Sequence, residues 1–444
     1  MEEDHEVPDF AEEDQIGIPQ DDDSSACGSD DSEMESFAEY GPKIELLLED
    51  IGLTGFSVEP LQHGYSYQNC VYALKSLSGD EGYIMRVPNC PDLDETGSRC
   101  QDILDNVSLL GFLADKLPVP QVKAYSASTK NALGAPFEIQ TRLPGQSLDH
   151  VYSDMSFEEK ALLVDQFVKL LVKLESVTFA TAGTFAASSS LPDMANDFTN
   201  DTCPSINFFN EGDEEFVKDP RCAADRAGPN LRALLTSHLN GWIQQEMKGD
   251  EVHRSFIVPP FRRLLGIVES LCKSAPLKDH LSPVVLYHWD LEPRNVMVEK
   301  ISGVWTITGI IDWDDACAVP RPLARKPPAW IWEFEHEICT GHLDTDFHPV
   351  HNLSNEDKNL KSCFDIAASV ALPGYLEDAY GRGQWFRRMW QLIRTAINTP
   401  WYLELMDQLL KEWDERPTPA APQPESRKSL WKMSLDWLSS YFQI

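Results

Sequence analysis

The chain has 444 residues, of which 42% are hydrophobic and 10% aromatic, so it can bury a large core and exceeds one ordinary domain. It carries 72 acidic and 37 basic residues, a net charge of −35, which disfavours nucleic-acid binding because phosphates would be repelled. No apolar run approaches the roughly 18 residues of a membrane span.

The acidic residues are concentrated at the start of the chain. Residues 1–42 contain 16 Asp or Glu and neither Lys nor Arg. This composition favours a disordered, solvated arm, and an acidic interaction tail or phosphoacceptor segment is the alternative. The first residues lack the basic and apolar regions of a secretion signal, and the ten cysteines include no C-x-x-C pair. We therefore expect a reducing, cytoplasmic setting.

Strands are predicted after the acidic arm. Phe56–Gln62 and Cys70–Leu74 flank the turn His63–Asn69, which contains one glycine, Gly64. Such a turn can lay backbone N–H groups over phosphates, but an ordinary hairpin fits the sequence about as well. The next strand, Gly82–Pro88, contains one charged residue in an apolar run, and a solvent-facing arginine at the strand end is one interpretation of it.

Helical periodicity appears twice in the next hundred residues. In Gln101–Lys116 the apolar residues fall on one face, which predicts an amphipathic helix. Ser156–Glu159 has the pattern of a helix cap, and the helix should run to about Glu175. Residues 176–235 form an insertion rich in Ser, Asn, Pro and Gly, for which a cover over a cleft and a surface excursion are equally compatible.

The most informative segment is 286–315, LYHWDLEPRNVMVEKISGVWTITGIIDWDD. It contains H-x-D with an asparagine after four intervening residues, and a mostly apolar run that ends on Asp312. Pro283–Tyr287 is predicted as a buried strand, and Asn295–Val298 with Val304–Thr308 as a β-hairpin. The hairpin should return Asp312 beside the loop, so residues 17 apart can point into one cleft.

This order of groups is the one that a kinase-type phosphoryl-transfer site needs. Asp290 would accept or orient the proton of an acceptor hydroxyl. Asn295 and Asp312 would supply the hard oxygen ligands that magnesium prefers. We expect His288 to brace the loop. A chance match is disfavoured, because strands flank the motif on both sides.

The sequences LYHWDLEPRNVMVE and ITGIIDWDDA resemble the aminoglycoside phosphotransferase and choline kinase superfamily, over about Phe56 to Tyr380. The resemblance implies an α+β, two-lobed protein-kinase-like fold with a small β-rich N-lobe and a larger, mainly helical C-lobe. It implies ATP and Mg²⁺ as cofactors, and transfer of the γ-phosphate to a hydroxyl of a small molecule. The matching positions are the catalytic base, Asp290, and the metal ligands, Asn295 and Asp312.

The resemblance also assigns the nucleotide side. Gly64 and Ser66 fall where the family places its phosphate-covering loop, and Arg86 falls where a Lys or Arg contacts the α- and β-phosphates. In a kinase-like lobe a helix glutamate normally pairs with that cation, but the predicted helix contains no Glu. Asn106 stands at the glutamate position, so Asp105 would substitute for it or the nucleotide alone would hold the cation. Pro136–Gly145 resembles the last N-lobe strand.

Beyond Asp312 the chain is basic and proline-rich. Arg321 and Arg325 lie near phosphates or partner carboxylates in one interpretation, and belong to a rigid packing loop whose cations pair with surface acids in the other. For Asp314 and Asp315 we expect hydrogen bonding to their own loop. Further residues could line an acceptor pocket or serve as cap and surface residues; they are Tyr375, Glu377, Asp378 and Tyr380.

These predictions divide the chain into consecutive parts: the acidic arm 1–42, the nucleotide-binding N-lobe 43–145, the C-lobe 146–415, a Pro-rich linker 416–428, and an amphipathic helix 429–444 that docks on its own lobe. A catalytically inactive, kinase-shaped interaction module is the competing interpretation. A protein kinase is disfavoured because D-F-G and A-P-E are missing from the expected places. The identity of the acceptor and any protein partner stay open.

Overall fold

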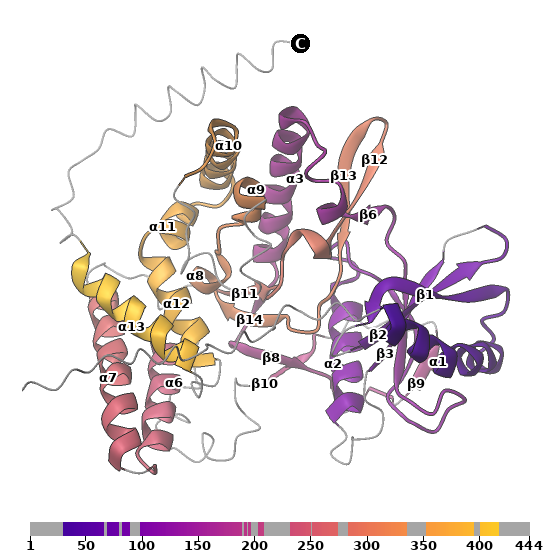
Figure 1. The fold of residues 1–444 in the computed structure, drawn as a ribbon, viewed down its shortest axis with the longest axis horizontal. Coiled ribbons are helices and arrows are strands. Elements are labelled where there is room, and N and C mark those ends of the chain that lie inside the picture. The colour runs from indigo at the N-terminus through magenta and orange to yellow at the C-terminus, as the bar shows by residue number, and fades with distance from the viewer. Residues whose placement is uncertain are drawn as a thin grey trace, which may run out of the picture.

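The computed structural model describes residues 30–65, 69–79, 82–88, 98–188, 191–192, 194–196, 203–207, 231–249, 251–273, 283–334, 352–394 and 400–416. These residues form a small lobe built on an antiparallel sheet and a larger, mainly helical lobe (Figure 1). This is the two-lobed α+β arrangement predicted from the sequence.

The small lobe contains a six-stranded sheet in the order β1-β2-β3-β5-β4-β9. Helix α1 (Asp30–Asp50) packs against β1, and α2 (Ser98–Leu113) contacts β4 and β5. The strands are β1 (Phe56–Tyr65), β2 (Asn69–Ser76), β3 (Tyr83–Pro88), β4 (Val122–Ser126), β5 (Phe137–Thr141) and β9 (Met194–Asn196). Because β9 comes from the insertion 176–235, this segment extends the small-lobe sheet and is more than a surface excursion.

The large lobe contains a second sheet, β10-β8-β14-β11-β7, and a three-stranded sheet, β13-β12-β6. Its strands are β6 (Gln146–Ser147), β7 (Thr178–Phe179), β8 (Gly183–Ala186), β10 (Ser205–Asn207), β11 (Val284–Tyr287), β12 (Val296–Ile301), β13 (Val304–Ile310) and β14 (Cys317–Pro320). Its helices are α3 (Phe157–Ser176), α6 (Leu231–Glu246), α7 (Glu251–Lys273), α8 (Arg321–Ala324), α9 (Trp330–Glu333), α10 (Asn355–Ala371), α11 (Tyr375–Tyr380), α12 (Arg382–Arg394) and α13 (Pro400–Glu415). Figure 1 shows α6, α7, α12 and α13 gathered at the end away from the small lobe.

Two hydrophobic cores correspond to the two lobes, but helix α2 belongs to the larger one. The smaller core joins α1 to β1, β2, β3 and β5, with Tyr72 and Met85 at its centre. The apolar face predicted for the helix Gln101–Lys116, which is α2 in the structure, includes Val107 and Leu110 and is buried in the larger core. Hydrophobic burial thus attaches α2 to the lobe that carries the predicted catalytic loop, while the helix also borders the sheet.

Helix α3 follows the sequence prediction closely. It starts at a capping box in which Ser156 Oγ accepts from the Glu159 backbone N–H at 3.3 Å, and Glu159 Oε2 accepts from the Ser156 N–H at 3.0 Å. The predictions for the two chain ends are tested only in part, because most of these residues lie outside the described ranges. Helix α1 begins at Asp30, so residues 30–42 are helical where a disordered arm was expected. Residues 1–29, the linker beyond residue 416 and the tail helix 429–444 lie outside the described residues.

Among the described residues, no helix is both long and apolar enough to cross a membrane. The described cysteines that carry free thiols are Cys70, Cys100, Cys203, Cys272, Cys317 and Cys363.

His238 on α6 makes the stability of the large lobe depend on pH. Its ring packs edge-on against Trp390 of α12, and Nδ1 lies 3.0 Å from the Leu234 carbonyl oxygen. Burial lowers the pKa of His238 to about 4, from an ordinary value of 6.5. The unfolded chain therefore binds a proton that the folded chain excludes between these pH values, so stability is full above pH 6.5 and falls as the pH drops toward 4.

We expect His238→Gln to flatten this dependence by up to about 1.4 kcal/mol per pH unit between pH 6.5 and 4. Urea unfolding at pH 7.5, 6, 5 and 4.5 measures the slope for each protein. His150→Gln is the control, because the side chain of His150 is 63% exposed. Parallel pH profiles for wild type and His238→Gln would contradict the prediction.

Candidate active site

One β-hairpin assembles the loop that the sequence predicts to be catalytic. Strand β11 ends at Tyr287, a 3-10 turn covers Pro293–Asn295, and β12 pairs with β13 so that Val296 faces Ile310. The turn between the two strands places Ser302 (φ 52°) and Gly303 (φ 85°) in the left-handed region. The Ile311 N–H then donates to the Asn295 carbonyl oxygen at 3.0 Å, which sets Asp312 beside Asn295.

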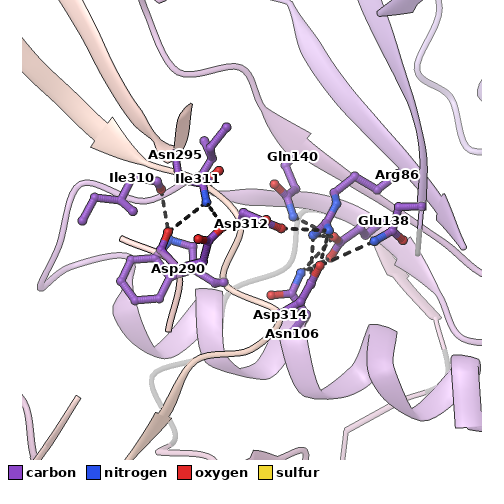
Figure 2. A network of polar contacts seen from close by, with 12 residues as sticks. Arg86, Asn106, Glu138, Gln140, Asp290, Asn295, Ile310, Ile311, Asp312 and Asp314 are labelled. Carbon is purple, nitrogen blue, oxygen red and sulfur yellow. Dashed lines mark hydrogen bonds and ion pairs between the residues drawn. The ribbon is translucent and has the colours of Figure 1, made fainter. Parts of the chain in front are cut away.

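Asp290 is held by two neighbours. Asn295 Nδ2 donates to Asp290 Oδ2 at 2.7 Å and to the Asp290 carbonyl oxygen at 2.9 Å. Arg294 donates to Asp290 Oδ1 at 2.6 Å. The Asp290 side chain is 20% exposed, so one face of an otherwise fixed carboxylate reaches solvent. Figure 2 shows Asp290, Asn295 and Asp312 next to one another.

Asp312 occupies an unusual backbone conformation. Its φ of 65° lies in the left-handed region, where a residue with a side chain is uncommon and costs on the order of 1 kcal/mol or more. Desolvation by the surrounding protein raises the pKa of this carboxyl to about 6, although 48% of the side chain is exposed; Arg86 opposes this shift, whereas Asp314 and Asp290 add to it. The acidic crowding around Asp312 would favour a bound cation.

His288 braces the loop, as the sequence suggested. It is buried, its Nε2 lies 3.0 Å from the Ile311 carbonyl oxygen, and its ring packs edge-on against Trp313 at 4.7 Å. Burial lowers the pKa of His288, and because a carbonyl oxygen can only accept, Nε2–H is the donor in this contact. The imidazole thus ties the start of the loop to the residue before Asp312.

The residues around Asp312 fit a magnesium ion that keeps several other ligands. Both amide donors of Asn295 serve Asp290, so the amide oxygen is the atom with which Asn295 would bind a cation. Asp312 would add a carboxylate oxygen. In the part of the chain that the structure describes, no cluster of three or more His, Cys, Asp or Glu could hold a metal alone. Two protein ligands supplemented by water and phosphate oxygens are typical of magnesium in phosphate sites.

Arg86 stands at the junction of the lobes, among three carboxylates (Figure 2). Nη1 donates to Glu138 Oε1 at 2.8 Å and to Asp314 Oδ1 at 3.1 Å, and Nη2 pairs with Asp314 Oδ2. Asp312 Oδ1 lies 3.6 Å from Nη2. Burial would lower the pKa of Arg86, but these acids outweigh it and raise the pKa. The side chain is 12% exposed, so the solvent-facing strand-end alternative is wrong.

Of the other two residues predicted to contact nucleotide, the structure describes Gly64. Gly64 lies near the end of β1, where the pairing with β2 is irregular between Pro60 and Tyr65. Ser66 lies outside the described residues. The strands on both sides of the predicted turn are present.

The partner of Arg86 differs from the sequence prediction. Asp105 does not substitute for the missing helix glutamate: its Oδ1 accepts from the Ala187 N–H at 2.7 Å and from Gln101 Nε2 at 2.6 Å. Asn106 contacts Glu138, the residue that sequence reasoning missed. Glu138 is the one acid in strand β5, and a strand-pairing prediction for β3 and β5 could have found it.

Asp314 was also missed, because hydrogen bonding to its own loop was expected. It stands two residues after Asp312, and the positive φ of Asp312 (65°) bends the segment between them. The structure shows both on the side of Arg86.

A cavity of about 340 Å³ lies beside Arg86 between the lobes. Helix α2 lines it with Asp102 and Asp105, the loop after β13 with Asp314 and Asp315, and the insertion with residues of β8 and β10. The insertion 176–235 therefore helps to shape the space between the lobes.

The basic segment after β14 is structural. Arg325 is 2% exposed and donates to Glu175 at 2.5 and 2.9 Å and to Asp378 at 3.1 Å. The packing interpretation holds for Arg325, but its partners are largely buried acids and not surface acids. Tyr375 donates to the Lys326 carbonyl oxygen and Tyr380 to Asp365, so both hydroxyls are engaged within the protein.

Comparison with known proteins identifies the family. The sequence profile described as "Phosphotransferase enzyme family" matches residues 57–321, more than half of the chain and including every predicted site residue. The chain belongs to this family. The match ends earlier than the expected Tyr380.

Individual relatives are distant. The chain is 22% identical over 309 residues to a subtelomeric hrmA-associated cluster protein in each of two Aspergillus fumigatus strains, and the alignment spans 59% of this chain and 58% of each relative.

Solved structures are similar at 16% identity or less. Plasmodium vivax ethanolamine kinase has 16% identity and a TM-score of 0.43, covering 89% of this chain and 95% of its own. ADP-bound aminoglycoside phosphotransferase APH(2'')-Ib has 13% identity and a TM-score of 0.44, and the alignment covers 83% of this chain and 96% of that one. A Ralstonia eutropha protein described as a putative aminoglycoside phosphotransferase has 13% identity and a TM-score of 0.44, and the alignment covers 85% of this chain and 99% of that one. Family membership rests on the profile match, since these TM-scores are below 0.5.

The buried ion pairs of Arg325 lead to a stability prediction. Arg325→Met would leave Glu175 and Asp378 without their buried cation, and we expect a loss of about 3–5 kcal/mol in the free energy of unfolding. Arg321→Met is the matched control, because Arg321 is 32% exposed and lies 3.8 Å from Glu175, where an ion pair contributes at most about 1 kcal/mol. Urea unfolding at pH 7.5 measures both. Equal losses would show that burial does not set the strength of this network.

Proposed function

We propose that this protein transfers the γ-phosphate of ATP, bound as its magnesium complex, to a hydroxyl of a small molecule. Membership of the phosphotransferase family supports the reaction class. The observation that carries the proposal is the convergence of Asp290, Asn295 and Asp312 at one end of the β12–β13 hairpin, fixed by the hydrogen bond between Ile311 and Asn295.

Each residue has a role that follows from its contacts. Asp290 would orient the acceptor hydroxyl and receive its proton; Asn295 holds the carboxylate in place for this task. Asn295 and Asp312 would bind magnesium, which neutralises charge on the phosphates. Arg86 would contact the α- and β-phosphates as a permanent, forked cation, and the backbone around Gly64 and Ser66 would cover them.

Arg294 shields Asp290 in this structure. Its guanidinium lies on Oδ1, the side of the carboxylate opposite the Asn295 contact, and is half exposed. An entering acceptor hydroxyl would have to share or displace this arginine, which can turn into solvent because its side chain is long and unburied.

An inactive interaction module is the second candidate. The observation that favours it is the pairing of Arg86 with Asp314, which occupies the cation where phosphate oxygens would bind. The intact triad of Asp290, Asn295 and Asp312 favours the enzyme, because a module without catalysis has no need for this arrangement.

A comparison of ATP consumption tests the proposal. Wild type is assayed with Mg²⁺ and ATP against a panel of sugars, choline-like amines and aminoglycosides. With an acceptor that supports turnover, we expect Asp290→Asn to lower kcat about 10²–10⁴-fold, because it removes the base while nucleotide binding is kept. Binding of Mg-ADP by calorimetry checks that the variant is intact.

Asp165→Asn is the control, since Asp165 is an exposed aspartate on α3 that pairs only with Lys169 in the described structure. Its turnover should match that of wild type. Wild-type turnover no greater than that of Asp290→Asn across the whole panel would favour the inactive module.

A further inference from the structure

The side chain that anchors Arg86 comes from a strand and not from helix α2. Glu138 lies directly across the sheet from Arg86, because the two residues are Cα partners in the antiparallel pairing of β3 with β5. Their side chains meet at 2.8 Å, with 12% of Arg86 and 1% of Glu138 exposed. Water and salt therefore screen this ion pair little.

Helix α2 contributes an amide to the same carboxylate. Asn106 Nδ2 lies 2.9 Å from Glu138 Oε1 and 3.0 Å from Oε2, and Gln140 Nε2 donates to Oε1 at 2.8 Å. These neutral donors fix the rotamer of Glu138 without competing for its charge. A glutamate in place of Asn106 would set a second carboxylate against Glu138, and two such groups repel in a buried site.

We infer that Glu138 is the positioning residue of Arg86, taking from strand β5 the part that a helix glutamate plays in a kinase-like lobe. The inference rests on the proposed nucleotide site. Since hydrogen-bonded strands fix the distance between Arg86 and Glu138, a shift of α2 relative to the sheet leaves the ion pair formed. The strand pairing thus sets the distance between the two charges, and Asn106 adds an orienting contact from the helix.

Asp314 is the exchangeable partner of Arg86. It comes from the loop after β13, its side chain is 26% exposed, and it reaches Arg86 from the other lobe. Nucleotide phosphates would replace Asp314 on the guanidinium, while Glu138 stays in place behind it. Both partners are carboxylates. Glu138 stays in place because it is buried and strand-paired, whereas the more exposed Asp314 can be replaced.

A charge-relocation experiment tests this role. Wild type, Glu138→Gln, Asn106→Glu and the double variant Asn106→Glu/Glu138→Gln are titrated with Mg-ADP. We expect each single variant to weaken binding about tenfold or more, because Arg86 has lost its anchor or faces two competing acids. The double variant should return to within about threefold of wild type, since it restores one carboxylate, now from the helix side.

Recovery of Mg-ADP affinity in the double variant is the decisive result. A glutamate on helix α2 could not replace Glu138 if Glu138 acted only by supporting the fold. A double variant that binds no better than Glu138→Gln overturns the inference. Thermal unfolding of all four proteins shows whether they are folded. If Glu138→Gln fails to fold, Asn106→Ser removes both amide contacts while keeping the carboxylate, and should weaken Mg-ADP about threefold; unchanged binding overturns the inference.

Glu59→Gln is the matched control. Glu59 lies in the same sheet and pairs with Lys75 of the neighbouring strand, but its side chain is 45% exposed. Its Mg-ADP affinity should equal that of wild type. Failure of the inference and of the proposed function are distinguishable: if wild type binds no Mg-ADP, both are overturned, whereas equal binding by wild type and Glu138→Gln overturns only the role of Glu138.

Discussion

The ion-pair cluster of Arg86 is the constraint on which the junction of the lobes depends. A guanidinium that is nearly removed from water must have charged partners, because an unpaired buried charge is costly. Glu138 satisfies it within the small-lobe sheet, and Asp314 satisfies it from the loop that follows β13. One cation therefore links the sheet to the segment that carries Asp312.

A second constraint acts inside the large lobe. The hairpin β12–β13 brings Ile311 back to Asn295, and His288 ties the start of the loop to the same backbone. These short contacts fix the three side chains in the folded protein. Their conformational entropy is therefore lost on folding and not when a ligand binds. The positive φ of Asp312 is the local strain that this arrangement carries.

Both constraints bring negative charge to the same site. Asp312, Asp314 and Glu138 gather around the buried Arg86, and Asp290 adds to the repulsion at Asp312, so acids outnumber the cation there. A divalent cation would relieve the repulsion near Asp312, and phosphates would compensate for the loss of Asp314 from Arg86. Acids that repel one another without ligand would thus favour the binding of a metal–nucleotide complex.

The sequence by itself determined the local elements and the catalytic block. The capping box of α3, the apolar face of α2 and the hairpin around Gly303 depend on residues close together in the chain, so periodicity and turn chemistry predict them. The grouping of Asp290, Asn295 and Asp312 followed from the same hairpin. Only the tertiary structure decided the partner of Arg86, because the pairing of β3 with β5 joins residues 52 positions apart. It also decided that Arg325 is buried and that strands of the insertion enter the six-stranded and the five-stranded sheets, since such long-range packing leaves no periodic trace in the sequence.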